Sequence, residues 1–192
     1  IGNTGPDFSY GFGRVNVRRA NEVLESGQFM YNQVYQNDSI SYNLTVPSGL
    51  CKLKILIGWR DAEGTSGMAQ SLVNNLDLKV TDPAGATTLP WILDTAKANV
   101  NNTATKGIDN INNHELVSID NPTSGNYVIK VSGTNVSVGP QDFYIVYQFQ
   151  RTGLTLVYPS GEEKWISGQT ESIRWDNDCI ASGTYQLSYS SD

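Results

Sequence analysis

Apolar residues recur at every second position from about residue 28 to residue 150 of this 192-residue chain. A period of two is that of a strand with one buried face, and turn-forming Pro, Gly, Asn and Ser bound each run. Strands of this kind need a second layer to cover their apolar faces, so we predict an all-β fold, an antiparallel β-sandwich of jelly-roll type. The runs are Ile40 to Val46, Leu53 to Trp59, Leu76 to Val80, Val117 to Ile119, Tyr127 to Val131 and Phe143 to Phe149.

The segments that flank this region have other patterns. In "GFGRVNVRRANEVLESG" the apolar residues from Val15 to Leu24 fall mostly on one helical face, with Asn16 able to cap the start and Gly27 the end. After Leu154 the chain supplies about three strands, too few for a core of their own. We therefore predict a short helix within residues 1–27, a sandwich over residues 28–151, and a partial β unit over residues 152–192.

Charge and hydropathy exclude two classes of partner. The net charge is −6 and the sequence pI is about 4.7, whereas a nucleic-acid-binding protein needs a basic face. No run of residues is long and apolar enough to cross a bilayer. The two cysteines, Cys51 and Cys179, are far apart. Two buried free thiols are the simpler expectation, and a disulfide between distant segments remains open.

A Gly-Thr-Ser sequence at residues 64–66 is the candidate for a catalytic nucleophile. Serine catalysis needs a base and an orienting acid at the hydroxyl, and His114 is the only histidine. Ser66 lies between two strand patterns and not ahead of a helix, and Gly67 follows it. We therefore expect no catalytic residue here, and interpret Ser66 and His114 as exposed loop residues.

Oxygen-bearing side chains crowd two stretches, Asn74 to Asp77 and Asp109 to Glu115. Calcium takes about six to eight such oxygens, often from loops at strand ends. Turn chemistry explains each cluster without a metal, so the residues alone leave both interpretations open. Alternation assigns Leu76 and Leu78 to the core, so Asp77 should project from the other face of its strand.

Three stretches also resemble known families. "GPDFSYGFGRVNVRRANEVL" resembles the end of a subtilisin-like serine protease (subtilase) catalytic domain, where a Tyr-Gly-x-Gly turn leads into the final helix. "LVNNLDLKVTDPAG" and "GIDNINNHELVSIDNPTSGNYVIKVSGTNVSVGPQDFYIVYQF" resemble the sandwich that follows this domain in one subtilase branch, which is similar to the P domain of proprotein convertases. "VYPSGEEKWISGQTESIRWD" is similar to Ig-like repeats of bacterial secreted and cell-surface proteins.

The resemblance implies a role for each part. Residues 1–27 would end a catalytic domain whose triad lies before Ile1, which puts Ser66 on the wrong side of the helix. The sandwich would be a non-catalytic region that braces this catalytic domain, its expected partner, in a secreted or cell-surface serine endopeptidase. Residues 152–192 would begin an Ig-like domain.

The resemblance also implies a calcium site. The family's Asn-Asp-Leu-Asp element appears as residues 74–77 with an amide, Asn75, in place of the first carboxylate, and the Asn-Asn-x-Glu element ends at Glu115. We therefore predict weak calcium binding by Asn75, Asp77, Asn112, Asn113 and Glu115.

Two other functions fit the same sequence. A carbohydrate-binding or adhesive module of a cell-surface protein would need exposed, coplanar aromatic rings, which Trp59, Trp91, Tyr144 and Tyr158 could supply. Trp59 continues the core alternation of its strand and is therefore better interpreted as buried. A spacer that leads to a surface anchor is the other possibility, since sandwich folds host many functions.

Overall fold

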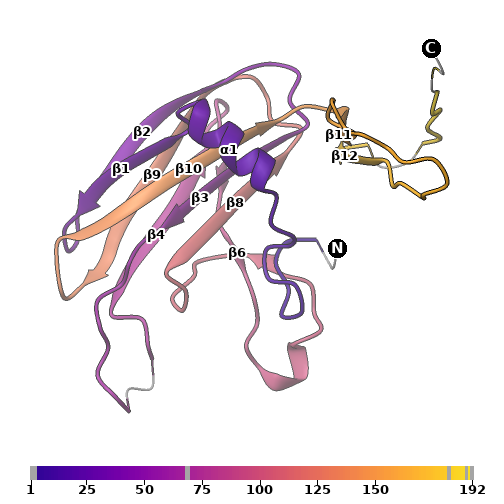
Figure 1. The fold of residues 1–192 in the computed structure, drawn as a ribbon. Helices are drawn as coiled ribbons and strands as arrows, with labels where there is room; N and C mark the ends of the chain where they lie inside the picture. The colour runs from indigo at the N-terminus through magenta and orange to yellow at the C-terminus, as the bar shows by residue number, and fades with distance from the viewer. Residues whose placement is uncertain (1–3, 68–69, 181–182, 189, 191–192) are drawn as a thin grey trace. The chain divides into compact units, whose positions relative to one another are not determined.

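A computed structural model describes residues 4–67, 70–180, 183–188 and 190 of the chain. The chain forms two compact units, residues 1–149 and residues 150–192. The first unit contains the helix and the sandwich, and the second contains a two-stranded sheet (Figure 1). The assignment of residues 1–27 to a catalytic domain stays a prediction.

The predicted helix is present as α1, Val17–Glu25. Asn16 precedes it in an extended conformation, and its side chain accepts a hydrogen bond from Arg19 N at 3.0 Å. This bond satisfies one of the amides that the first turn leaves without a helical partner. Ser26 is the C-cap, and Gly27 follows with φ of 65°, the left-handed conformation with which many helices end.

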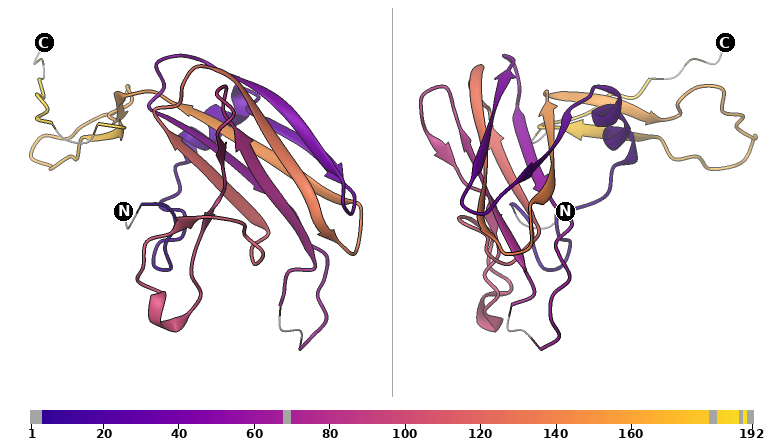
Figure 2. Two further views of the ribbon diagram at one scale, coloured as in Figure 1. Left: turned by 180° about the vertical axis from the view of Figure 1, so that it is seen from behind. Right: turned by 90° about the vertical axis from the view of Figure 1, so that its left-hand side faces the viewer.

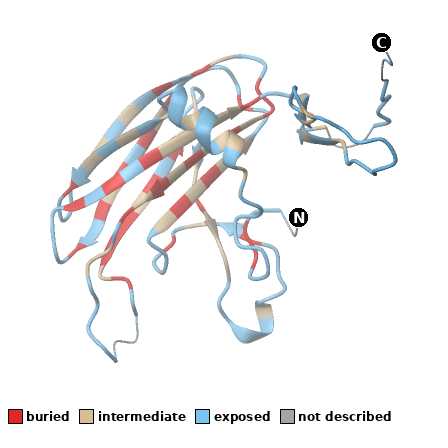
Figure 3. Ribbon diagram, viewed as in Figure 1, coloured by how far each residue is buried: buried red, intermediate tan, exposed pale blue. Residues whose placement is uncertain are grey.

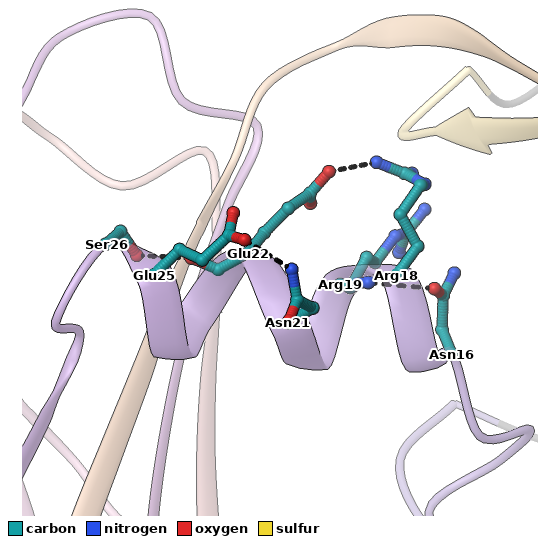
Figure 4. Close-up of polar contacts among 7 residues, drawn as sticks. All are labelled: Asn16, Arg18, Arg19, Asn21, Glu22, Glu25 and Ser26. Carbon is teal, nitrogen blue, oxygen red and sulfur yellow. Dashed lines mark hydrogen bonds and ion pairs between the residues drawn. The ribbon is translucent and has the colours of Figure 1, made fainter.

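Polar pairs on the surface of α1 support it weakly. Arg18 pairs with Glu22, and Asn21 Nδ2 donates to Glu25 Oε1 at 2.7 Å (Figure 4). Pairs at this spacing contribute about 0.2–0.5 kcal/mol each. None of the nine residues of α1, all of which are described, is buried. A helix this short depends on tertiary packing, so α1 is held only marginally.

Two antiparallel sheets of four strands each make up the sandwich, which confirms the all-β prediction. The first has the order β1 (Phe29–Val34), β10 (Gln141–Gln150), β3 (Lys52–Gly58) and β8 (His114–Asp120). The second has the order β2 (Ser39–Val46), β9 (Gly125–Val136), β4 (Asn74–Thr81) and β5 (Thr87–Thr88). Figure 2 shows the strands from two further directions.

The core lies between the sheets, and buried residues alternate with more exposed ones along each long strand (Figure 3). Trp59 belongs to this core, as its alternation predicts, and its indole Nε1 donates to the carbonyl of Asn74 at 3.1 Å. The fully buried apolar side chains include Val34, Leu53, Ile55, Ile57, Leu76, Val80, Val117, Ile129, Val131, Phe143 and Ile145.

Several short or irregular strands were not predicted. In β1 the outward positions carry apolar Phe29 and Tyr31 while Asn32 takes an inward one, so the alternation is broken. The segment from Pro90 to Ile111, which has no strand pattern in its sequence, contains β6 (Trp91–Ile92) paired with β7 (Thr105–Lys106), and the 3-10 turn η1 (Lys97–Asn99). Strands of two residues are too short to show a period.

The second unit pairs β11 (Gly153–Tyr158) with β12 (Arg174–Asp178) in antiparallel fashion. Large apolar side chains in this unit, among them Leu156, Trp165 and Leu187, are exposed. Two strands give them no second layer to pack on. The Ig-like character of this unit stays a prediction.

The expectation of two free thiols is wrong, because Cys51 and Cys179 are both disulfide-bonded. Two cysteines in a sequence do not reveal their oxidation state, and the burial of Cys51 is typical of free and bonded cysteines alike. Among the described residues, no helix is long and apolar enough to span a membrane.

Candidate metal site

The candidate site forms where β4, in one sheet, passes β8, in the other. The short β5 pairs with β4 only at Val80 and Thr81, so within the described residues the preceding part of the β4 edge has no strand beside it. Glu115 points inward from β8 to this part of the β4 edge. Its Oε2 accepts a hydrogen bond from the backbone N–H of Leu78 at 2.6 Å. A side chain of one sheet thus completes the hydrogen bonding of the other.

Three oxygens around this contact are buried and have no hydrogen-bond partner: Asn75 Oδ1, Asp77 Oδ1 and Glu115 Oε1. The other polar atoms of the same groups are engaged. Asn75 Nδ2 donates to Asn110 Oδ1 at 2.8 Å, and Thr134 Oγ1 donates to Asp77 Oδ2. Buried oxygens without partners are uncommon and costly. Three of them lie on two facing strands, where an electropositive ligand would satisfy them.

The electrostatics of the cluster point in the same direction. Burial raises the pKa of Glu115, which is 1 % exposed, from an ordinary value of 4.5 to about 9. The hydrogen bond from Leu78 N opposes this increase in pKa, and the nearby carboxylates of Asp77 and Asp109 add to it. A cation would reverse the balance, because it favours the ionised form of each carboxyl group.

Asp77 projects away from the core side of β4, as the alternation predicts, while Leu76 and Leu78 are buried. The two loop asparagines make other contacts. Asn112 Nδ2 donates to Asp109 Oδ2 at 2.7 Å, and Asn113 Nδ2 donates to the carbonyl of Trp59 at 3.0 Å. Both residues are exposed. Their role as metal ligands stays a prediction.

Three polar residues that sequence reasoning missed hold the site in place. Asp109 is buried and accepts from the N–H groups of Ile111 and Asn112, so it shapes the loop and adds negative charge near Glu115. Asn110 holds the amide of Asn75. The crowding of Asp and Asn at 109–113 was the available signal, but it did not separate ligands from turn formers.

The third missed residue is Asp61, which fixes the start of β4. Its Oδ2 accepts from Val73 N at 2.7 Å and its Oδ1 from Asn74 N at 2.8 Å. Asp61 also lines a polar depression of about 290 Å³ together with Ser71, Asn112 and Asn113. No signal in the sequence links Asp61 to a segment twelve residues further on.

The donor set suits a hard cation such as calcium, which prefers carboxylate and amide oxygens in flexible arrangements. Within the described part of the chain, no group of three or more His, Cys, Asp or Glu side chains is placed to hold a metal ion. The candidate site therefore depends on amide oxygens beside two carboxylates. Such a site carries less negative charge than an all-carboxylate one, which favours weak binding.

Among the described residues, Ser66 and His114 form no hydrogen bond with each other. Ser66 is exposed in a turn. His114 is the first residue of β8, not a loop residue as predicted, and its ring lies edge-on to Phe12 with 5.1 Å between centroids. The absence of catalytic residues stays a prediction.

Within the described part of the first unit, the residues considered for sugar binding, Trp59, Trp91 and Tyr144, form no exposed row of coplanar rings. Trp59 is buried. Trp91 is half-buried, with the Lys106 ammonium 4.1 Å above its ring. Tyr31 and Tyr144 are exposed neighbours, but their ring planes are tilted by 48°. A sugar ring stacks on coplanar aromatic faces, so this arrangement offers it no platform.

Comparison with known proteins gives one sequence relative. No protein-family model matches the chain. It is 30% identical to the serine protease/ABC transporter B family protein tagD of Dictyostelium discoideum in an alignment that covers 65% of this chain. The matched stretch is 7% of that protein, so the chain spans a small part of its relative.

Solved structures share only weak similarity. A Bacillus licheniformis lipase in its propeptide form gives a TM-score of 0.39 at 15% identity, covering 65% of this chain and 22% of the lipase. A periplasmic inhibitor of g-type lysozyme from Aeromonas hydrophila gives 0.32 at 20% identity, covering 62% and 84%. Aeromonas sobria serine protease, in complex with its chaperone, gives 0.29 at 12% identity, covering 78% and 33%. Scores this low carry no argument about function.

Proposed function

We propose that the sandwich binds one calcium ion at the β4–β8 contact. The observation that carries the proposal is the set of three buried oxygens without partners, on Asn75, Asp77 and Glu115. A bound cation would satisfy these oxygens and offset the repulsion between the two carboxylates. Its chemistry here is structural: it would tie a strand of one sheet to a strand of the other.

The remaining ligands would come from the neighbouring loop. Asn112 and Asn113 stand in that loop and are the predicted donors, and water would complete the coordination. With two carboxylates among the ligands, we expect a dissociation constant of about 10⁻⁴ to 10⁻³ M, the range of extracellular modules. Calcium at about a hundred times that constant would stabilise the folded state by roughly 2.7 kcal/mol.

Terbium luminescence and thermal melting test the site directly. The Trp59 indole donates to the carbonyl of Asn74, and the backbone carbonyl of Trp59 accepts from Asn113, so the indole lies near enough to sensitise a bound lanthanide. We expect terbium emission on excitation of tryptophan, displacement by calcium, and a higher melting temperature in calcium than in EDTA. Asp77→Asn should lose all three effects.

Glu63→Gln is the matched control, because it removes a carboxylate from an exposed loop of the same unit and should leave each effect unchanged. A melting temperature that is the same in EDTA and in saturating calcium, with no terbium emission, would refute the site. The polar cluster would then be turn chemistry alone.

We further propose that this chain is a non-catalytic accessory region of a larger, secreted or cell-surface serine endopeptidase of the subtilisin type. Support comes from the 30% identity to a relative whose name includes serine protease, and from the subtilase-like Gly-turn, helix and sandwich in sequence order. In this role the sandwich would brace the catalytic domain.

Two experiments test the accessory role: reading the coding sequence upstream of Ile1, and deleting the sandwich from the peptidase. We expect a Gly-Thr-Ser-x-x-x-Pro motif within a few dozen residues before Ile1, and slower heat inactivation of the peptidase when residues 28–151 are present than when they are deleted. An upstream region that lacks this motif would refute the subtilisin assignment without bearing on the calcium site.

A further inference from the structure

Strand β2 leaves one of its sides open. It is the terminal strand of its sheet: it pairs with β9 along Ser39–Val46 and, among the described residues, with no strand on its other side. A terminal strand presents a row of backbone N–H and C=O groups that can template another strand. At eight residues β2 is longer than the average strand.

The other terminal strands of the sandwich differ from β2 in length, in charge or in the contacts of their edge amides. At the far end of the same sheet, β5 has only two residues. In the opposite sheet, β8 carries Glu115 and Asp120, and in β1 the amide of Gln33 already donates to Asn32 Oδ1 at 2.8 Å. The β2 sequence, "SISYNLTV", contains no charge, no proline and no glycine. Short length, charge and proline are the usual protections of an edge.

We propose that two copies of this chain pair through their β2 edges about a two-fold axis, which joins two four-stranded sheets into one of eight strands. The occupant is a second copy because the edge is uncharged within a chain of net charge −6. Two acidic molecules approach with least repulsion where neither carries charge. A two-fold axis lets the same patch serve both copies and closes the assembly at two.

The alternation of β2 fixes the register of this pairing. Ile40 and Leu44 face the core side, and Ser41 and Asn43 face outward. Antiparallel pairing about a two-fold axis keeps each face continuous only when the axis passes through a residue, and Tyr42 and Asn43, at the middle of β2, leave the longest overlap. The second would bring Pro47, which has no N–H to donate, opposite the start of the partner strand. We therefore centre the pair on Tyr42, so that Ser41 of one copy lies opposite Asn43 of the other.

Paired substitutions at these two outward positions test both the pairing and its register. In Ser41→Lys/Asn43→Lys, lysines meet lysines across the axis, and the dimer dissociation constant should rise at least about tenfold, since directly opposed like charges destabilise strand pairs. In Ser41→Glu/Asn43→Lys, each glutamate meets a lysine, and the constant should stay near that of the wild type. Asn126→Lys adds one such charge to the outward face of the interior strand β9 and is the control.

Sedimentation velocity of the full chain over a range of concentrations measures the constant, and thermal melting verifies that each variant is folded. We expect a concentration-dependent dimer in the wild type and the control. A monomer at every concentration would overturn the proposal. So would a dimer that persists in the folded lysine pair, or a glutamate–lysine pair no tighter than the lysine pair. None of these outcomes depends on calcium binding or on the protease assignment.

Discussion

Replacing Glu115 by glutamine should stabilise the sandwich in the absence of calcium, and the gain should increase with pH. Burial raises the pKa of Glu115 to about 9 from an ordinary 4.5. Between these values the folded protein holds a proton that the unfolded chain releases, so stability falls as the pH rises. Glutamine carries no charge, and its side-chain oxygen can still accept from Leu78 N, the donor at 2.6 Å in the wild type.

The size of the stability difference follows from the pH range between the two pKa values of Glu115. Each pH unit between the two pKa values changes the free energy of unfolding by about 1.36 kcal/mol. From pH 5 to pH 8 the wild type in EDTA should therefore lose up to about 4 kcal/mol that the variant keeps. Every other carboxyl group titrates in both proteins, so the difference between them isolates Glu115. Calcium should narrow this difference at pH 8, because it binds the ionised carboxylate that the variant lacks and adds roughly 2.7 kcal/mol to the wild type alone at about a hundred times its dissociation constant.

Urea unfolding, followed by tryptophan fluorescence at pH 5 and pH 8 in EDTA, measures the effect. Glu63→Gln, at an exposed position, is the control and should follow the wild type at both pH values. A difference between wild type and Glu115→Gln that is the same at pH 5 and pH 8 would refute the reasoning. So would a variant that is less stable than the wild type at pH 8 without calcium.

Three further outcomes are expected. Asn74→Ala should lower the free energy of unfolding in urea by about 2–4 kcal/mol, because the buried Asn74 side chain donates to the carbonyl of Val138 and accepts from its N–H. A loss equal to that of the exposed control Asn126→Ala would contradict this. Asn16→Ala should weaken α1 by about 1 kcal/mol and reduce the helical circular dichroism, yet leave the urea midpoint of the sandwich unchanged; a shifted midpoint would show that α1 is integral to the core. A serine-directed fluorophosphonate should not label Ser66, and stoichiometric labelling would disprove the non-catalytic interpretation.

The long strands were predictable because burial on one face imposes a period of two on their side chains, as in Leu53, Ile55 and Ile57. Strand β1 escaped this rule because Phe29 and Tyr31 put apolar side chains on its outward face as well. The period of two does not predict which strands pair with each other. Partners such as β3 (Lys52–Gly58) and β10 (Gln141–Gln150) lie far apart in the sequence, and no local pattern encodes their pairing.

The candidate site was partly predictable for a related reason. The crowding of oxygens drew attention to Asp77 and Glu115, which the structure brings close enough for their charges to interact. The hydrogen bond from Leu78 to Glu115 could not be foreseen, because it exists only where the short β5 leaves the edge of β4 open. The contacts of Asn112 depend on the path of its loop, which turn-forming residues permit but do not determine.

Because Leu78 N donates to Glu115, hydrogen exchange of this amide reports a different motion from that of the other strand amides. Ladder amides exchange with solvent deuterium when their strand separates from its neighbour in the same sheet. The Leu78 amide is protected by a side chain of the opposite sheet. Its exchange therefore reports the parting of the two layers, even while each ladder stays intact. Comparing the exchange rate of the Leu78 amide with those of amides bonded within a sheet would show whether the two sheets separate before the strands of one sheet do.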